Sequence, residues 1–345
     1  MAHLNSTRPK SGDLANPAAS RYASAVALYA QDLERVEREI NANFHSDVAL
    51  IPKVSAYLAG GGGKRIRPLL VIASSRLCGY TGAIRQITHS VVAEYIHAAT
   101  LLHDDVVDEA ELRRGAQSAN MKFGNEASVL VGDFLFAKSF QLMSDDGDIR
   151  IIQTVAEATR NLAEGEVLQL VNTMNLEITE DIYLDTIYRK TGALIEACCR
   201  IGAILGGSPT EREEALAGYG RDIGMAFQLV DDALDYAGEK SAWGKPIGAD
   251  LAEGKVTMPL IRAIQMAGDA EREDIASLME SDEELGPRLD RIMMILKKYD
   301  TISTTLEMAR GYAASARERL ISAFEPSIHL TSLLDVADYI VERKV

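Results

Sequence analysis

The 345-residue chain lacks any long apolar run and any apolar leader at its N-terminus. A membrane-spanning helix needs about 20 consecutive apolar residues, and a secretory leader needs a basic start, an apolar stretch and a small-residue cleavage site. Hydrophobic residues make up 47% of the chain and charged residues 25%, which is typical of a soluble globular protein. We therefore expect no membrane span and a cytoplasmic location.

Cysteine is scarce, and so is any excess of basic charge. The three cysteines, Cys78, Cys198 and Cys199, match no metal-binding spacing. The adjacent pair lies in an apolar stretch, so we expect buried, reduced side chains in a reducing compartment. With 36 basic against 51 acidic residues, the formal net charge of −15 disfavours nucleic acid as a partner.

Strand-type alternation is nearly absent, whereas apolar residues recur three and four positions apart along almost the whole chain. This pattern predicts an all-α protein of ten or more helices. Clusters of glycine, proline and small polar residues are expected to separate the helices. These clusters lie at 60–63, 144–148, 206–209, 238–248 and 281–287.

The domain organisation follows from the same pattern. Residues 1–20 show no periodicity and are predicted to be a disordered tail, and residues 21–345 are predicted to form a single domain. The segment 128–136 (SVLVGDFLF) is apolar on more than one face, which predicts a central helix surrounded by others. We therefore expect the functional site in a cavity between helices.

Two segments of the helical pattern carry the same arrangement of aspartates. At 101–108 (LLHDDVVD) and 227–235 (FQLVDDALD), an apolar turn precedes the motif Asp-Asp-x-x-Asp. Aspartates four residues apart share one face of a helix, so the two motifs predict two facing sites. We call Asp104, Asp105 and Asp108 the first aspartate cluster, and Asp231, Asp232 and Asp235 the second aspartate cluster.

Each cluster concentrates negative charge inside an apolar helix. Burying such charges beside apolar neighbours is costly unless a cation is present. Carboxylate oxygens are preferred ligands of Mg²⁺, which usually also binds phosphate oxygens of a substrate. The clusters therefore predict magnesium sites for a diphosphate. A single acidic cluster is also typical of a solvated surface, but two matched clusters in apolar helices favour the metal site.

Basic groups that a diphosphate needs lie close to the first cluster. The glycine loop at 60–63 precedes Lys64 and Arg67, and such a loop before a helix is typical of an anion site. His97 lies seven residues before Asp104, on the same side of an ideal helix, where it is either a core residue or a further donor.

Further basic and polar residues follow each cluster. Arg113 and Arg114 come shortly after the first cluster, and their planar guanidinium groups can bind two phosphate oxygens at once, unless they form only an exposed basic turn. The segment 244–255 (GKPIGADLAEGK) is rich in helix breakers and predicts a lid over the site. Other candidate donors later in the chain are Lys190, Thr191, Gln228, Lys245 and Lys255.

Six segments occur in the order GKRIRP, LLHDDVVDEAELRRG, VGDFL, EGEVLQL, YRKTGALIEA and FQLVDDALDY. Together they make residues 25–340 similar to the trans-type polyprenyl diphosphate synthases, and most similar in appearance to the long-chain octaprenyl, solanesyl and decaprenyl enzymes of quinone side-chain synthesis. The resemblance implies an isoprenoid-synthase-type helical barrel around a deep central cavity, and a homodimer. It also implies Mg²⁺-dependent condensation of isopentenyl diphosphate with an allylic diphosphate such as farnesyl diphosphate.

The resemblance also implies a role for each candidate residue. The first cluster would hold Mg²⁺ on the allylic diphosphate through Asp104 and Asp108, and the second would hold a further Mg²⁺ through Asp231. The diphosphate of isopentenyl diphosphate would contact Lys64, Arg67, His97 and Arg114. The allylic side would be completed by Arg113, Lys190, Thr191, Gln228, Lys245 and Lys255. The residues expected to be catalytic are Asp104, Asp108, Arg113, Lys190 and Asp231.

Product length is expected to depend on Ala99 and Thr100, about one turn before the first cluster. In the resembling family, short-chain enzymes place bulky aromatic groups there, so small residues predict an open wall and a long product. Close packing between helices would equally explain small residues at these positions.

The alternatives are a short- or medium-chain synthase, a class I terpene cyclase and a non-catalytic regulatory subunit. A cyclase would leave the basic residues of a second diphosphate site unexplained. A regulatory subunit is expected to have degraded aspartate motifs, and both motifs are intact.

Overall fold

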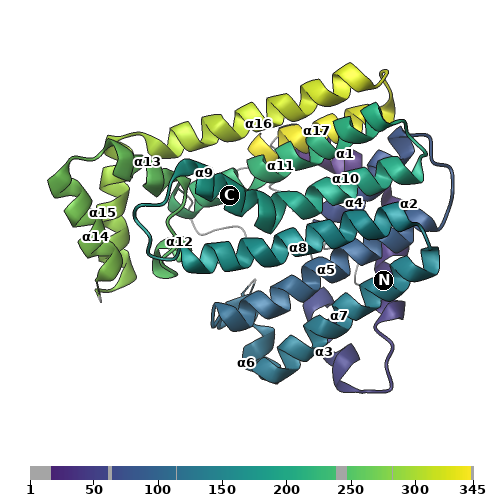
Figure 1. The fold of residues 1–345 in the computed structure, drawn as a ribbon, viewed down its shortest axis with the longest axis horizontal. Helices are drawn as coiled ribbons and strands as arrows, with labels where there is room; N and C mark the ends of the chain where they lie inside the picture. Colours follow the sequence, from purple (N-terminus) through teal and green to yellow (C-terminus); the bar gives the residue numbers. More distant parts are fainter. Residues whose placement is uncertain (1–16, 61–63, 114, 238–246, 282, 343–345) are drawn as a thin grey trace.

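The computed structural model describes residues 17–60, 64–113, 115–237, 247–281 and 283–342, and most of them are helical (Figure 1). This confirms the predicted all-α class. The helices are α1 (Pro17–Leu28), α2 (Ala30–Asn43), α3 (Leu50–Gly60), α4 (Ile66–Leu77), α5 (Arg85–Val107), α6 (Ala119–Phe123), α7 (Asn125–Asp146), α8 (Ile149–Val171), α9 (Glu180–Ile187), α10 (Ala193–Leu205), α11 (Thr210–Ala237), α12 (Ala249–Ala252), α13 (Met258–Met266), α14 (Asp269–Glu280), α15 (Leu285–Lys298), α16 (Thr301–Ala323) and α17 (Ile328–Glu342).

Two short elements complete the fold, and the helical pattern predicted neither of them. Strands β1 (Leu112–Arg113) and β2 (Ala116–Gln117) form an antiparallel hairpin in which Leu112 is opposite Gln117. The π-helical turn η2 (Tyr188–Gly192) joins α9 to α10 without a break. Both elements carry candidate site residues, so the irregular parts of the backbone lie at the functional part of the molecule.

The core is built around α10, in which every residue except Arg200 is buried. Helix α10 packs against α4, α8 and α11, and Cys198 and Cys199 are fully buried in it, as expected. A Cβ on Gly202 would lie 2.4 Å from the Cβ of Ser74 in α4, so glycine permits this close helix contact.

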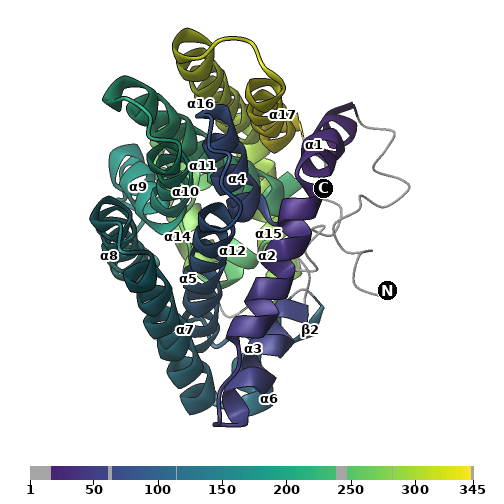
Figure 2. The ribbon, with the colours of Figure 1, turned by 90° about the vertical axis from the view of Figure 1, so that its right-hand side faces the viewer.

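The outer helices surround this core in a consistent arrangement. Helices α5, α7 and α8 run roughly parallel below α10, and α16 and α17 lie along the opposite side, while α14 and α15 project from one end (Figure 1). A quarter turn shows α1 and α2 on the flank opposite α8 (Figure 2). Helix α1 lies beside α17, where the rings of Tyr22 and Tyr339 stack 4.3 Å apart.

The predicted helix breakers mark real boundaries wherever the structure describes them. Helix α7 ends before Gly147, and Asp148 caps α8 by accepting a hydrogen bond from the Arg150 amide at 3.1 Å. Helices α10 and α11 meet at 206–209, and α14 and α15 meet between Glu280 and Leu285.

Two sequence expectations need correction. Helix α1 begins at Pro17 and buries Ala19, so helical structure starts inside the segment predicted as a tail; residues 1–16 lie outside the described residues. Helix α7, which contains the segment 128–136, is not surrounded on all sides, because 66% of Leu130 is exposed. Apolar residues on several faces therefore marked an exposed apolar surface as well as a core contact.

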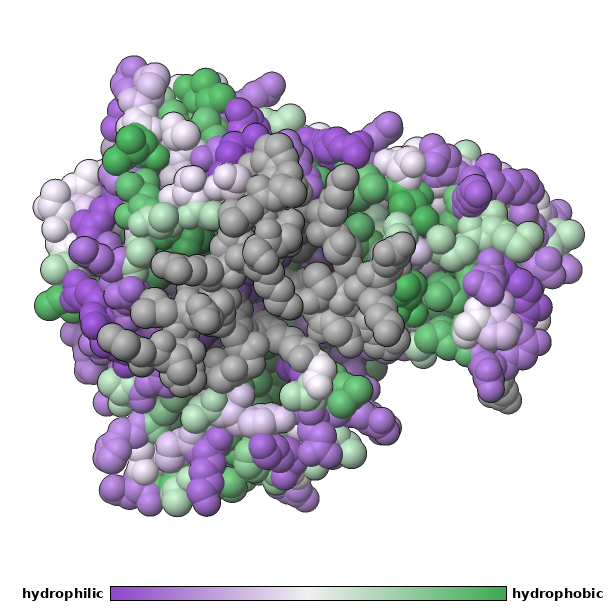
Figure 3. Space-filling model, turned by 180° about the vertical axis from the view of Figure 1, so that it is seen from behind, coloured by the Kyte–Doolittle hydropathy of each residue, from purple (hydrophilic) through white to green (hydrophobic). Residues whose placement is uncertain are grey.

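The surface is otherwise mixed. Seen from behind, hydrophilic residues surround the face and hydrophobic residues form separate patches (Figure 3). Within the described ranges, each helix is too short or too polar to cross a lipid bilayer.

Candidate active site

Helices α5 and α11 bring the two aspartate clusters to one cavity of about 310 Å³. Asp104 and Asp108 come from the end of α5, and Asp231 and Asp232 come from α11. The Asp108 amide donates to the Asp104 carbonyl at 2.8 Å, so the last turn of α5 continues through the motif. The prediction that the two clusters face one another is confirmed.

In the first cluster, the middle aspartate is held by an arginine of the hairpin. Asp105 is 1% exposed, and its Oδ1 accepts hydrogen bonds from Nε of Arg113 at 2.7 Å and from the terminal guanidinium nitrogen at 2.6 Å. Asp105 does not line the cavity, whereas Arg113 does. The hairpin thus places the positively charged Arg113 side chain beside the aspartates that precede it in sequence.

The pKa of the Asp104 carboxyl group is raised well above its ordinary value. Burial raises its pKa to about 7, and the nearby charges of Glu166 and Asp108 add to this effect, while Lys190 and Arg113 oppose it. A carboxyl group with such a pKa indicates a site with too little positive charge for its anions.

In the second cluster, the middle aspartate is held by neutral donors. Asp232 is 4% exposed and accepts hydrogen bonds from the Tyr183 hydroxyl and, at 2.7 Å, from Nε2 of Gln228. Oε1 of Gln228 accepts in turn from the Thr191 hydroxyl at 2.9 Å. Burial raises the pKa of Asp232 to about 6 despite these donors.

Asp235 contacts the backbone of the next helix. Its carboxylate accepts hydrogen bonds from the amides of Ala249 at 3.2 Å and Asp250 at 3.0 Å, at the start of α12. It does not line the cavity, but Asp250 does. Asp235 therefore fixes the segment that leads to Lys255.

The basic groups of the cavity are paired with carboxylates. Nζ of Lys190, on η2, donates to Glu166 and Gln169 of α8, both at 2.7 Å. Nζ of Lys255 lies 3.6 Å from Asp108 and also contacts Glu253. Burial alone would lower the pKa of Lys255, but Asp108 and Glu253 raise it above its ordinary value.

The carboxylates of the cavity fit a magnesium ion that also binds phosphate oxygens of a substrate. Asp104, Asp108 and Asp231 offer hard carboxylate oxygens to one cavity. Among the described residues, no three acidic, histidine or cysteine side chains converge closely enough to enclose a metal ion by themselves. Mg²⁺ commonly binds one or two carboxylates together with phosphate oxygens and water, which is what this arrangement can provide.

The residues expected to bind isopentenyl diphosphate lie on the neighbouring helices α4 and α5, which pack together. Lys64 precedes α4 and Arg67 lies in its first turn, while His97 lies on α5. Nε of Arg67 is buried without a hydrogen-bond partner among the described residues, and burial lowers the pKa of this guanidinium. Such a group suits an anionic ligand. Arg114 and Lys245 lie outside the described residues.

The two chain-length candidates, Ala99 and Thr100, lie outside the cavity lining, unlike their neighbour Leu101. Ala99 is fully buried, and Thr100 is partly buried and donates its hydroxyl hydrogen bond to the His97 carbonyl at 2.9 Å. Neither lines the cavity, whereas Leu101 does.

Several residues of the cavity were not predicted individually. Glu166 and Gln169 lie within the quoted segment EGEVLQL, so the motif was noticed but its polar residues were not assigned. Tyr183 belongs to no quoted motif, and Asp250 lies in the quoted segment 244–255 but was not assigned a role; proximity in the fold reveals both. The unpredicted residues that line the cavity or contact its lysine are Leu101, Glu166, Gln169, Asn172, Thr173, Ile178, Tyr183, Thr186, Ile187, Asp250, Val256 and Thr257.

Comparisons with known proteins identify the family of the chain. The profile of the Polyprenyl synthetase family matches residues 48–296. Over 314 residues the chain is 41% identical to the octaprenyl diphosphate synthase of Haemophilus influenzae, covering 90% of this chain and 94% of that protein.

Solved structures show the same relationship. A decaprenyl diphosphate synthase from Rhodobacter capsulatus matches with a TM-score of 0.89 and 43% identity, covering 94% of this chain and 99% of that one. A polyprenyl synthase from Caulobacter crescentus, complexed with calcium and isoprenyl diphosphate, has a TM-score of 0.89 and 38% identity, covering 98% and 100%. The chain is therefore a prenyltransferase that belongs to the polyprenyl synthetase family.

Proposed function

We propose that this chain is a long-chain trans-prenyl diphosphate synthase that extends an allylic diphosphate, probed most simply with farnesyl diphosphate, by repeated condensation with isopentenyl diphosphate. The observation that carries the proposal is the single cavity in which both aspartate clusters meet Arg113, Lys190 and Lys255. An octaprenyl-to-decaprenyl product for a quinone side chain is the expected outcome.

The chemistry follows from the charges that line the cavity. The C–O bond of the allylic diphosphate breaks with the electron pair on diphosphate, which is a poor leaving group unless cations surround it. Bound Mg²⁺, held by Asp104, Asp108 and Asp231, would neutralise part of that charge. Arg113, Lys190 and Lys255 would bind the remaining oxygens. The double bond of isopentenyl diphosphate then attacks the allylic carbon, and the departing diphosphate can accept the proton that is lost.

The direct test is an assay of the purified chain with Mg²⁺, farnesyl diphosphate and labelled isopentenyl diphosphate. Chromatography of the dephosphorylated products should show long polyprenols, and chelation should stop the reaction. A regulatory subunit would give no product by itself. A terpene cyclase would consume farnesyl diphosphate without incorporating label.

The division of the site between two diphosphates is tested by varying each substrate. We expect Arg114→Ala to raise the KM for isopentenyl diphosphate, and Lys190→Ala to raise the allylic KM and lower kcat. If Arg114→Ala raised the allylic KM alone, the division would be wrong.

Product length is tested at Ala99. If the growing chain passes this residue, Ala99→Tyr should shorten the product while leaving the first condensations intact. Leu101→Ala is a useful companion because Leu101 lines the cavity. An unchanged product from Ala99→Tyr together with a changed product from Leu101→Ala would move the wall of the tunnel to Leu101.

A homodimer in the cytoplasm is part of the proposal. Helices α7 and α8 expose Leu130, Val167, Leu170 and Val171 by 60% or more, and a second copy could cover them. The three cysteines are free thiols, which suits a reducing compartment. Sedimentation should show a dimer, and Leu130→Arg should weaken it.

A further inference from the structure

Lys190 and Thr191, which we propose to bind the allylic diphosphate, stand on the π-helical turn η2. Neighbouring residues on this turn reach opposite helices, because Lys190 contacts Glu166 and Gln169 on α8 and Thr191 contacts Gln228 on α11. π-Helical turns are rare and are frequently found at functional sites. What holds this turn between the two helices therefore decides where both side chains point.

Helix α8 closely contacts the turn at Gly165. A Cβ on Gly165 would lie 2.7 Å from the backbone nitrogen of Lys190 and 2.8 Å from the Cβ of Arg189. Backbone atoms cannot yield as a flexible side-chain end can, so any side chain at 165 must displace the turn. Gly165 is itself buried, so a side chain added there cannot turn away from the contact into solvent.

Helix α11 presses on the turn from the other side, again at a glycine. A Cβ on Gly224 would lie 2.7 Å from Cα of Gly192, the last residue of η2. Gly192 and Gly224 are both buried. The turn is therefore in backbone contact with both helices, one at each end of the pair formed by Lys190 and Thr191.

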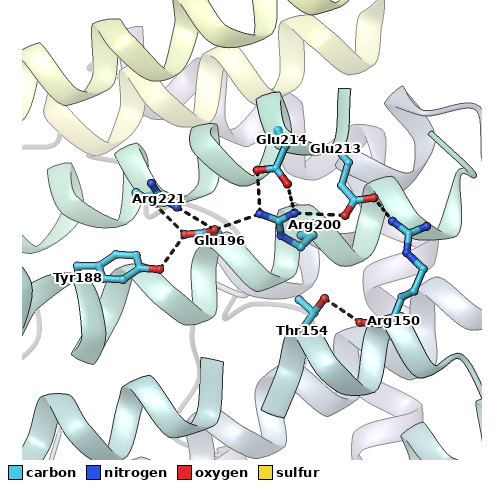
Figure 4. Close-up of polar contacts among 8 residues, drawn as sticks. All are labelled: Arg150, Thr154, Tyr188, Glu196, Arg200, Glu213, Glu214 and Arg221. Atoms are coloured by element: carbon cyan, nitrogen blue, oxygen red, sulfur yellow. Dashed lines mark hydrogen bonds and ion pairs between the residues drawn. The ribbon is translucent and has the colours of Figure 1, made fainter. Parts of the chain in front are cut away.

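An ion-pair network anchors the first residue of the turn (Figure 4). The Tyr188 hydroxyl donates to Glu196 of α10 at 3.1 Å, and Glu196 also accepts from Arg221 of α11 at 3.0 Å and from Arg200 at 3.4 Å.

The network continues from α10 to the start of α8. Arg200 contacts Glu213 at 3.2 Å, and Arg150 of α8 contacts the other oxygen of Glu213. Residues of this network line a separate polar cavity of about 420 Å³. Its charges are mutually paired, so the network braces α8, α10 and α11 around the turn.

We propose that Gly165 and Gly224 are positioning residues that clamp η2 between α8 and α11, and that this clamp sets the orientation of Lys190 and Thr191 toward the allylic diphosphate. The proposal rests on the proposed function for the identity of that diphosphate. Displacement of such groups by about 1 Å can cost up to about 10²-fold in rate.

The test compares Gly165→Ala and Gly224→Ala with two glycine controls in the full chain. Gly311→Ala, in α16, places its Cβ where no atom lies within 4 Å. Gly206→Ala places its Cβ 2.3 Å from the Cβ of Cys78, so it creates a similar clash at the far end of α10. Thermal unfolding and separate KM values for the two substrates are measured for all four.

We expect the allylic KM to rise about tenfold or more in Gly165→Ala and Gly224→Ala, with the isopentenyl KM within about twofold of wild type. Gly206→Ala should lose thermal stability but keep both KM values, and Gly311→Ala should change neither. Folded Gly165→Ala and Gly224→Ala proteins with a wild-type allylic KM would overturn the clamp. An equal rise of the allylic KM in Gly206→Ala would reduce it to general packing.

Two further measurements keep the clamp testable. If the alanine variants fail to fold, Tyr188→Phe, which removes one hydroxyl, is measured instead. Loss of its hydrogen bond to Glu196 should raise the allylic KM by about threefold. An unchanged allylic KM would overturn the proposal that the position of η2 sets allylic binding. Calorimetric binding of inorganic diphosphate with Mg²⁺ needs no turnover. Weaker binding in Gly165→Ala would support the clamp even if the wild-type chain made no polyprenyl product, and unchanged binding would overturn it.

Discussion

The two aspartate clusters share one sequence pattern but differ in what holds the middle aspartate. Asp105 accepts charged hydrogen bonds from Arg113, which comes from the short hairpin after α5. Asp232 accepts neutral hydrogen bonds from Tyr183 and Gln228, which stand on helices. The first cluster thus depends on an ion pair, and the second on a chain of neutral donors.

The clusters also differ in their place on the helix. The first cluster ends α5, where the negative end of the helix dipole adds to the repulsion among carboxylates, whereas the second lies within α11. Burial raises the pKa of Asp104 to about 7 and that of Asp232 to about 6. The comparison teaches that identical motifs can differ in charge balance, with the greater need for a cation at the first cluster.

The largest expected effect tests what the clusters have in common. Asp104→Ala and Asp231→Ala should each lower turnover by about 10²-fold or more, since each removes a carboxylate that faces the cavity. Circular dichroism and thermal unfolding should show folded proteins. Asp145→Ala, an exposed aspartate at the end of α7, is the control and should retain full activity. Near-normal turnover of either cluster variant with ample Mg²⁺ would show that the mutated aspartate is not a metal ligand.

The ion pair of the first cluster is tested by Arg113→Ala. This change leaves the buried Asp105 carboxylate unpaired, so the free energy of unfolding should fall by about 2–3 kcal/mol, somewhat below the value for a fully enclosed pair. Adding Asp105→Asn should restore part of the stability but not the activity. Arg317→Ala, which breaks a pair with Asp338 far from the cavity, should cost stability alone.

The pH dependence of stability should reveal the raised pKa of one carboxyl group in each cluster. A carboxyl whose folded pKa lies above its unfolded value stabilises the protein at low pH, and this contribution is lost as pH rises through the folded pKa. In chelated protein, Asp104→Asn and Asp232→Asn should therefore each gain melting temperature over wild type as pH rises from about 4 toward neutral, because burial raises the pKa of both carboxyl groups.

The pH comparison includes its own check. Adding Mg²⁺ with inorganic diphosphate should stabilise wild type more than either alone, because the carboxylates are then neutralised. A pH-independent difference between wild type and Asp104→Asn would contradict the charge imbalance of the first cluster.

The smallest effect is expected for Tyr183→Phe, which removes one neutral donor from Asp232. Stability should fall by about 1 kcal/mol and turnover by a few fold, since Gln228 still donates to the carboxylate. Tyr299→Phe removes a hydroxyl that donates to Glu271 in α14 and is the matched control. A loss as large as that of Arg113→Ala would show that the second cluster depends equally on its partner.

The sequence predicted the parts of the site that follow from helical periodicity. Spacing alone places Asp104 and Asp108 on one face of α5, and the repeated motif predicts that the clusters face each other. Basic residues close in sequence, such as Arg113, could be assigned because a diphosphate needs cations.

The sequence could not predict contacts that depend on the turn η2 or on helix rotation. The letters YRKTG fit an ordinary helix, so the pairing of Lys190 with Glu166 and Gln169 was not predicted. Ala99 is buried away from the cavity, whereas Leu101, only two residues later on the same helix, lines it. Such differences depend on how α5 packs, which no local pattern specifies.

The pairing of Lys190 with Glu166 and of Lys255 with Asp108 makes substrate binding an exchange of partners. A diphosphate that engages either ammonium group competes with its carboxylate, and the displaced carboxylate then requires another cation. Under the proposed function, Mg²⁺ bound together with the diphosphate would supply that cation. If these salt bridges must break for substrate to bind, the metal ion and the anion would each bind more tightly in the presence of the other.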